Sequence, residues 1–325
     1  MNSSSGTILC KSRKNISCAI CFLRLTMQYY DIWQYNRSTA QKQIMTKNNP
    51  KNEIYPAALS IAGSDSGGGA GIQADLRTFN AFGVYGCTAI TAVTSQNPKK
   101  VARIDAIPAE GVVSQIETVL EAIRVRCAKT GMLFSAEIVS AVAACMARHE
   151  LPLVVDPVMV STSGSMLLKE DAVEALKNEL FPLADWITPN LPEAELLLGR
   201  KLKGEADYID AARECHERWG AAVLLKSGHA PAGRFANDFI CREGCVYRLS
   251  SKRLPDRGQS HGTGCTLSSA LAAALALEMP WKSALCEAKA FVLGSLAEYV
   301  EIGPGVPAMY PPVDDRVEQV RLEKL

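Results

Sequence analysis

The 325-residue sequence has little net charge, no apolar run long enough to cross a membrane, and no cysteine spacing typical of a disulfide scaffold. A formal net charge of +1 gives no electrostatic reason to expect nucleic acid or an anionic membrane as a partner. A membrane span would need a run of about 20 apolar residues, which the chain lacks. The eleven cysteines are scattered, and in a chain of this length they indicate a reducing compartment, the cytoplasm.

Several common motifs are missing as well. The glycine-rich segment 63–71 lacks the Gly-Lys-Ser/Thr of a Walker A loop, and its glycines do not follow the G-x-G-x-x-G spacing of dinucleotide-binding loops. Cys18-x-x-Cys21 and Cys241-x-x-x-Cys245 each match half of a zinc site, but no second pair of Cys or His lies close by in the sequence. There is no repeat at the periods of solenoid proteins. These absences argue against a P-loop protein, a zinc finger and a repeat protein.

The first 54 residues differ in charge from the rest of the chain. They carry a net charge of +6, which leaves −5 for the remainder. The apolar run 16–23 follows a basic segment but lacks a clean small-residue cleavage site, which argues against a secretory signal. We expect residues 1–54 to be an extension that is disordered or not native, and residues 55–325 to form one folded domain. Met45 is our candidate for the native first residue, and loss of the residues before it should leave activity unchanged.

From residue 57 onward, short apolar runs alternate with helical patterns. The expected strands are 57–62, 87–93, 125–132, 151–155, 186–188, 221–226, and a hairpin of 239–241 with 246–249. The expected helices are 72–82, 109–124, 136–149, 169–180, 192–198, 206–219, a long helix after 265, and 281–300. This alternation predicts an α/β protein with a mostly parallel sheet covered on both faces.

Polar residues follow the expected strands, at the point where each strand ends. They are Asp65, Gln96, Lys129, Asp156, Asn190 and Lys226. Because the carboxyl ends of parallel strands meet at one edge of a sheet, we expect these side chains to line one crevice.

The segment 258–277, GQSHGTGCTLSSALAAALAL, predicts an anion site. Two glycines precede a long apolar helix, so the first helical amides are left uncovered, and the positive end of the helix dipole favours a phosphate there. Cys265 lies at the same place, and we expect its thiol pKa to be lowered, which would make it a candidate base or nucleophile. The alternative is a turn that begins a core helix around an inert cysteine.

Six segments, in the same order along the chain, resemble the hydroxymethylpyrimidine/phosphomethylpyrimidine kinase family of the ribokinase-like superfamily. They are AGSDSGGGAGIQADL (62–76), KTGML (129–133), DPVM (156–159), TPNLPEAELL (188–197), KSGH (226–229) and HGTGCTLSSA (261–270). The resemblance covers about residues 57–300. It implies a ribokinase-like three-layer α/β/α sandwich with a mostly parallel central sheet. It also implies a homodimer that uses ATP and Mg²⁺ to phosphorylate 4-amino-5-hydroxymethyl-2-methylpyrimidine, and then its monophosphate, in thiamine diphosphate biosynthesis.

The resemblance also implies roles for individual residues. Gly262, Thr263 and Gly264 form the anion hole, and Cys265 stands where most sugar kinases of the superfamily have an aspartate and acts as catalytic base. The residues implied to bind the pyrimidine are Gly63, Asp75, Gln96 and Met132. Those implied to bind ATP are Lys226, Asn190 and Glu193, and those implied to hold Mg²⁺ are Asp156 and Glu193.

Structural alternatives stay open for several of these residues. Asp75 is also consistent with an ion-paired helix residue, and Met132 with a core residue. Asn190 is also consistent with a helix cap, with Glu193 as a first-turn partner of the helix dipole. Ser227 departs from the family pattern, which usually has glycine at that position, and we expect a small shift of the nucleotide loop.

A second departure lies in the pocket loop, where Ser66-Gly67-Gly68 replaces a common double serine, and we expect a looser loop. Two rival functions also remain. One is a pyridoxal kinase on the same scaffold, which would keep the GTGC turn and differ in the small pocket around Gly63, Gln96 and Met132. The other is a pyrimidine-binding protein without catalysis, which would need no magnesium site.

Overall fold

The computed structural model describes residues 54–325, except 160–167, 169, 229–232, 256–257, 259 and 315. The chain divides into two units, Met1–Glu53 and Ile54–Leu325, and the described residues all belong to the second unit. The predictions for residues 1–53, including the native start at Met45, lie outside the described residues.

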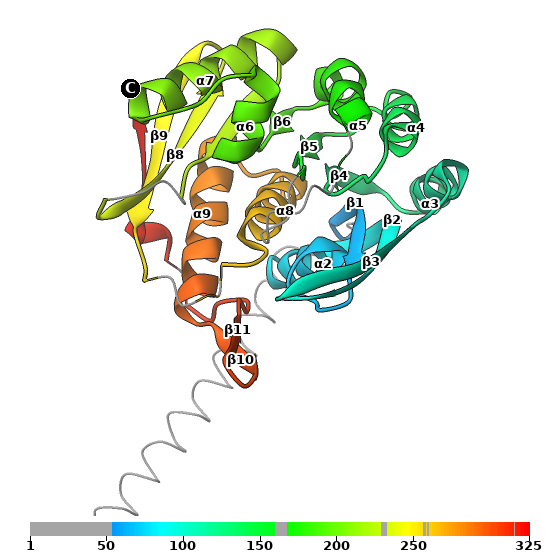
Figure 1. Cartoon of the computed structure of the whole chain (residues 1–325), viewed down its shortest axis with the longest axis horizontal. Helices are drawn as coiled ribbons and strands as arrows, with labels where there is room; N and C mark the ends of the chain where they lie inside the picture. Colours follow the sequence, from blue (N-terminus) through cyan, green and yellow to red (C-terminus); the bar gives the residue numbers. More distant parts are fainter. Residues whose placement is uncertain are drawn as a thin grey trace, which may run out of the picture. The chain divides into compact units, whose positions relative to one another are not determined.

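A ten-stranded sheet forms the centre of the second unit, in the order β12-β9-β8-β7-β6-β5-β4-β1-β2-β3 (Figure 1). Its parallel part consists of β1 (Ala57–Asp65), β2 (Tyr85–Asn97), β4 (Val125–Thr130), β5 (Leu153–Val155), β6 (Trp186–Ile187) and β7 (Ala222–Lys226). The antiparallel edges are β3 (Lys100–Ala106) on one side, and β8 (Phe235–Arg242), β9 (Cys245–Lys252) and β12 (Val320–Lys324) on the other.

Helices cover both faces of the sheet (Figure 1). On one face lie α2 (Gly71–Ala81), α8 (Thr263–Ala276) and α9 (Trp281–Ala297). On the other face lie α3 (Ala109–Ala122), α4 (Ala136–Met146), α5 (Glu170–Ala175), α6 (Leu191–Leu198) and α7 (Glu205–Trp219). The strand β1 shows how one sequence serves both layers: Ala58 packs under α8, whereas Leu59 and Ile61 pack under α3 and α4. The predicted three-layer α/β/α sandwich is confirmed.

The helix α8 is buried almost throughout, as its uncharged Ala- and Leu-rich sequence predicts. It packs against α2 and α9 and runs beneath β1, β4 and β5. Its N-terminus therefore lies at the carboxyl ends of the central parallel strands. None of the helices within the described ranges is both long and apolar enough to cross a membrane.

Some elements were not predicted from the sequence. The edge strands β3 and β12 were missed, as was the small ribbon of β10 (Val300–Gly303) and β11 (Val306–Ala308). β3, β10 and β12 are largely exposed and the three-residue β11 is half-buried, so none of these strands has the apolar run that reveals a buried strand. The expected helix 169–180 ends in a π-helical segment, Leu176–Leu180, which follows α5.

Candidate active site

A cavity of about 820 Å³ opens at the carboxyl ends of the parallel strands. Every residue that the sequence assigned to the site lines this cavity, except Asp75. These lining residues are Gly63, Gln96, Met132, Asp156, Asn190, Glu193, Lys226, Gly262, Thr263, Gly264 and Cys265. They come from strands and helices spread over some 200 residues of sequence, so the fold gathers them as the strand-end argument predicts.

The N-terminus of α8 forms one wall of the cavity. Its N-cap, Gly262, has a φ of +84° and makes no side-chain cap hydrogen bond. A Cβ atom at Gly262 would overlap the carbonyl oxygen of Gly69, so only glycine allows the two loops to touch. A Cβ atom at Gly264 would lie 3.2 Å from the Nζ atom of Lys226. The helix mouth therefore combines uncovered backbone with a nearby ammonium group, which suits an anion.

An ion pair lies directly beneath this mouth. Lys226 Nζ donates to Asp156 Oδ1 at 2.7 Å, and the same carboxylate accepts from the hydroxyls of Ser268 at 2.9 Å and Thr188 at 3.2 Å. Burial favours the neutral forms of both charged groups, but their mutual attraction outweighs it. As a result, the pKa of Asp156 lies below its ordinary value and the pKa of Lys226 lies above its ordinary value. Both side chains are therefore charged at neutral pH.

Asn190 and Glu193 form a reciprocal cap at the start of α6. Asn190 Oδ1 accepts from the Glu193 backbone N–H at 2.9 Å, and Glu193 Oε2 accepts from the Asn190 backbone N–H at 2.8 Å. The helix-cap alternative is thus observed, yet both residues also line the cavity. Burial raises the pKa of Glu193 to about 7, although the Lys226 ammonium opposes this shift.

Asp156 and Glu193 are the residues that could hold Mg²⁺. Two nearly buried carboxylates on one wall of the cavity provide the hard oxygen donors that this ion prefers. Mg²⁺ commonly uses one or two carboxylates and fills its remaining positions with water and phosphate oxygens. The residues present therefore fit the ion.

Asp75 does not face the cavity, and its implied contact with the pyrimidine is corrected here. The side chain is fully buried in α2, where both of its oxygens lie 3.0 Å from Lys129 Nζ. The hydroxyls of Ser60 and Ser269 donate to the same carboxylate at 2.6 and 2.5 Å. These four contacts occupy the carboxylate, so the ion-pair alternative is the one that the structure supports.

Lys129 is the site residue that the sequence analysis noted only as a strand end. Its ammonium lies in the cavity floor and is held there by Asp75. Burial alone would neutralise this group, but Asp75, with Cys265 and Asp156 nearby, raises the pKa of Lys129 above its ordinary value. The signal in the sequence that could have identified Lys129 as a site residue was its position at the end of a buried strand.

Cys265 differs from expectation in its ionisation. Burial raises the pKa of the thiol to about 11, an effect that the Lys129 ammonium and a hydrogen bond from the Gly71 backbone N–H only partly offset. The prediction of a lowered thiol pKa was therefore wrong, because desolvation exceeds the influence of the helix end. Asp75 and Asp156 add to the shift, since each places a negative charge near the sulfur.

The opposite wall of the cavity contains the residues assigned to the ring. A Cβ atom at Gly63 would lie 2.5 Å from Met132 Cε, so the Met132 side chain packs directly against Gly63, and both residues line the cavity. The backbone carbonyl of Met132 accepts from Thr91 Oγ1 at 2.7 Å, which fixes its position. Ser66 Oγ bonds to both the N–H and the C=O of Gln96, at 2.8 and 2.9 Å. The glycine loop is thus attached to β2, contrary to the expected looseness.

A third charged pair also lines the cavity and was missed in the sequence. Lys289 of α9 donates to Asp238 of β8 at 2.6 Å, and both residues line the cavity. Asp238 also accepts from the Ser227 backbone N–H at 2.9 Å, which anchors the strand end at the position where the family usually has glycine. Asp238 interrupts the apolar pattern of β8, and Lys289 interrupts that of α9. These two interruptions were the signal in the sequence that could have revealed the pair.

The fold and this site define a ribokinase-like kinase. The solved structure of pyridoxal kinase from Staphylococcus aureus with AMP-PCP and pyridoxal matches with a TM-score of 0.76 and 30% identity, covering 84% of this chain and 100% of that chain. More particularly, a phosphomethylpyrimidine kinase family model matches residues 65–309, and the chain belongs to that family. It is 47% identical over 251 residues to a hydroxymethylpyrimidine/phosphomethylpyrimidine kinase of Rhizobium meliloti, covering 76% of this chain and 94% of the relative. The structure of phosphomethylpyrimidine kinase from Clostridium difficile matches with a TM-score of 0.65 and 39% identity, covering 74% and 98%.

The contact between Gly262 and Gly69 can be tested by adding one methyl group. Gly262→Ala should lower the free energy of unfolding by about 2–4 kcal/mol, because it combines a left-handed backbone conformation with overlap against the Gly69 carbonyl. Gly199→Ala is the matched control, since Gly199 also has a positive φ, +69°, but its Cβ would meet open space. The control should lose only about 1–2 kcal/mol. Urea unfolding measures both, and equal losses would show that the loop contact is unimportant.

The raised thiol pKa of Cys265 predicts how its alkylation depends on pH. The thiolate fraction below the pKa grows about tenfold per pH unit, so the reaction of Cys265 with iodoacetamide should accelerate about 100-fold between pH 7 and 9. Peptide mass mapping would give the rate, with partly exposed Cys245 as an internal reference for the reagent. Rapid modification that is insensitive to pH above 7 would show that the thiolate is already formed in the free protein.

Proposed function

We propose that this protein transfers the γ-phosphoryl group of ATP to the hydroxymethyl oxygen of 4-amino-5-hydroxymethyl-2-methylpyrimidine, and then a second phosphoryl group to the monophosphate, in thiamine diphosphate biosynthesis. Family membership and the 47% identity to a relative of that name support the substrate. The observation that carries the chemistry is the uncapped N-terminus of α8, which opens into the cavity beside Lys226 and Asp156.

Phosphoryl transfer requires the protein to position the reactants and neutralise their charge more than to form a covalent bond to them. The substrate oxygen forms a bond to the γ-phosphorus while the bond from that phosphorus to the β–γ bridging oxygen breaks, and ADP leaves. Gly262, Thr263 and Gly264 line the cavity at the helix mouth beside Lys226, where the positive helix end would stabilise the charge that develops on the transferring group. When bound between Asp156 and Glu193, Mg²⁺ would neutralise phosphate charge.

Cys265 is our candidate for the base that removes the hydroxyl proton. Only the thiolate can accept that proton, and a pKa of about 11 makes the thiolate a minor species at neutral pH. The Lys129 ammonium in the cavity floor favours the thiolate. The rate should therefore increase with pH above neutrality, since each unit raises the thiolate fraction.

The cellular setting of this function is inferred less directly. We infer a cytoplasmic enzyme, because the eight cysteines within the described residues are all free thiols. The family resemblance supports a homodimer. The partners that the site suits are ATP and a small alcohol, and the near-neutral chain offers no case for nucleic acid.

A pyridoxal kinase is the second candidate function. The Staphylococcus aureus pyridoxal kinase gives a higher TM-score than the Clostridium difficile pyrimidine kinase, 0.76 against 0.65. The sequence identities run the other way, 30% against 39%, and the pyridoxal kinase match covers more of this chain, 84% against 74%. Because substrate choice depends on individual residues more than on overall shape, the pyrimidine is the favoured substrate.

Product analysis with purified protein tests the proposed function. Incubation with ATP, Mg²⁺ and the pyrimidine alcohol should yield the monophosphate first and the diphosphate afterwards, separated by chromatography and identified by mass. Pyridoxal in a parallel reaction should turn over more slowly. Faster turnover of pyridoxal would favour the second candidate, and no consumption of ATP with either alcohol would contradict both.

Replacement of Cys265 tests its role as base. Cys265→Ala should lower kcat by about 10²–10⁴ and leave the KM for ATP nearly unchanged, because the side chain acts on the alcohol proton. The variant should also lose the increase of kcat with pH that the wild type shows between pH 7 and 9. Cys215→Ala is the control, since Cys215 is buried in α7 away from the cavity. Near-normal turnover of Cys265→Ala would remove the cysteine from this role.

A further inference from the structure

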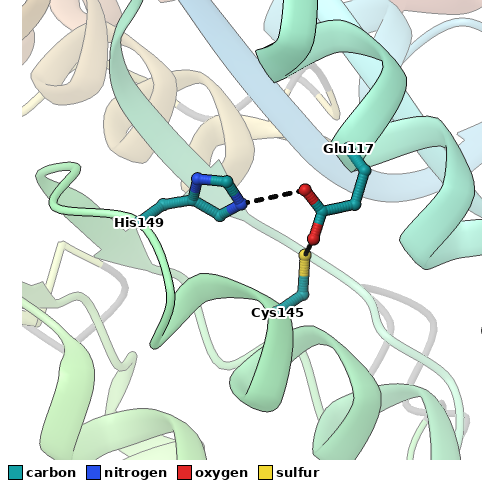
Figure 2. Close-up of side chains that lie close together, drawn as sticks. All are labelled: Glu117, Cys145 and His149. Carbon is teal, nitrogen blue, oxygen red and sulfur yellow. Dashed lines mark hydrogen bonds and ion pairs between the residues drawn. The ribbon is translucent and has the colours of Figure 1, made fainter.

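Three side chains of metal-binding type meet outside the cavity, between α3 and α4. Glu117 comes from α3, Cys145 from the last turn of α4, and His149 from the turn that follows α4 (Figure 2). Cys145 Sγ donates to Glu117 Oε1 at 3.3 Å, and His149 Nε2 lies 3.1 Å from Glu117 Oε2. The three candidate ligand atoms all lie within 4.8 Å of one another. None of these residues lines the active-site cavity.

The local backbone explains this convergence. Cys145 and His149 are four residues apart, so they project to the same side when the chain follows a helical path. The helix α4 ends at Met146, but the N–H groups of Arg148 and His149 still bond to carbonyls three residues earlier, at 3.1 and 3.0 Å. This turn keeps His149 above Cys145, where both face Glu117 on the neighbouring helix.

The group has a buried side and an open side. Cys145 is fully buried, whereas the side chains of Glu117 and His149 are 39% and 29% exposed. An ion arriving from solvent would therefore meet the carboxylate and the imidazole first. Arg148 also pairs with Glu117, on the oxygen that the thiol approaches. A bound cation would displace this arginine, whose side chain is 56% exposed and can turn into solvent.

We propose that Glu117, Cys145 and His149 form a binding site for a divalent metal ion of borderline softness, such as Zn²⁺ or Co²⁺. One thiolate, one imidazole and one carboxylate make three protein ligands, and water completes a tetrahedron. Metal–ligand bonds of about 2.0–2.3 Å put tetrahedral ligand atoms roughly 3.3–3.8 Å apart. The two contacts to Glu117, at 3.3 and 3.1 Å, are already close to this spacing, and the thiol and imidazole, which lie within 4.8 Å of each other, would move closer together. Mg²⁺ is excluded because thiolate and imidazole are poor ligands for it.

Binding at this site exchanges a proton for the metal. The Cys145 S–H bond breaks as the metal–sulfur bond forms, and the proton leaves to solvent with no change of oxidation state. The bound ion would join α3 to α4 by coordinate bonds in place of two hydrogen bonds. Because both helices cover the same face of the sheet, the expected effect is greater stability, with the phosphoryl transfer site unchanged.

Absorption spectroscopy with Co²⁺ tests the proposal on the full-length chain. After treatment with a chelator and its removal, one equivalent of Co²⁺ should produce a thiolate-to-cobalt charge-transfer band, and Zn²⁺ should abolish the band by competition. Cys145→Ser should lose the band. His149→Gln, a change at a partly exposed position that should fold normally, should weaken cobalt binding at least tenfold. In the wild type alone, Zn²⁺ should raise the Tm.

Two control variants separate this site from other thiols. The double change Cys18→Ser with Cys21→Ser removes the Cys-x-x-Cys pair that matches half of a zinc site in the sequence. Cys265→Ala removes the thiol that lines the active-site cavity. Both should keep the band. Loss of the band in either control, or its persistence in Cys145→Ser and His149→Gln, would overturn the proposal. Absence of any band in the wild type would overturn it too, and would leave the three residues as a hydrogen-bond network between helices.

Discussion

Two of the buried ion pairs at the cavity join the active-site end of the sheet to the helices that cover it. Lys226 with Asp156, and Lys129 with Asp75, join strand ends to the helices α8 and α2 that cover them. A buried charge without its partner costs about 3–5 kcal/mol, so neither pair can lose one member cheaply. Because of these pairs, the ammonium groups of Lys129 and Lys226 are already in place near the N-terminus of α8 before an anion binds. Preorganised charge of this kind is what phosphoryl transfer requires of a protein.

The central part of the fold could be predicted because its strands are buried on both faces. Such strands are continuous apolar runs, and the helices between them have a clear period. The edges could be predicted only in part. The hairpin of β8 and β9 was expected with shorter strands, whereas β3 and β12 were missed because they are largely exposed. The buried charge of Asp238 in β8 is stable there because Lys289 reaches it from α9. A contact between distant segments gives no periodic signal in either one.

For the site, the strand-end argument located the cavity, and the family pattern selected the residues on its wall. Two expectations failed for the same physical reason, which is burial. Asp75 is fully buried and paired with Lys129, and at half-buried Cys265 desolvation of the thiol exceeds the effect of the helix end. Depth below a surface depends on the packing of several elements, so one sequence does not reveal it. Asn190 and Glu193 show the reverse case, since a capping role and a place in the cavity wall proved compatible.

The contact of Gly69 with Gly262 joins parts of the chain that are nearly 200 residues apart. A ribosome makes the first of these glycines early and the second near the end of synthesis. The nascent chain therefore contains the central parallel strands before it contains the helix that covers them and completes the catalytic centre. A protein released early, before α8 is made, would carry the strand-end residues without the helix that completes the catalytic centre.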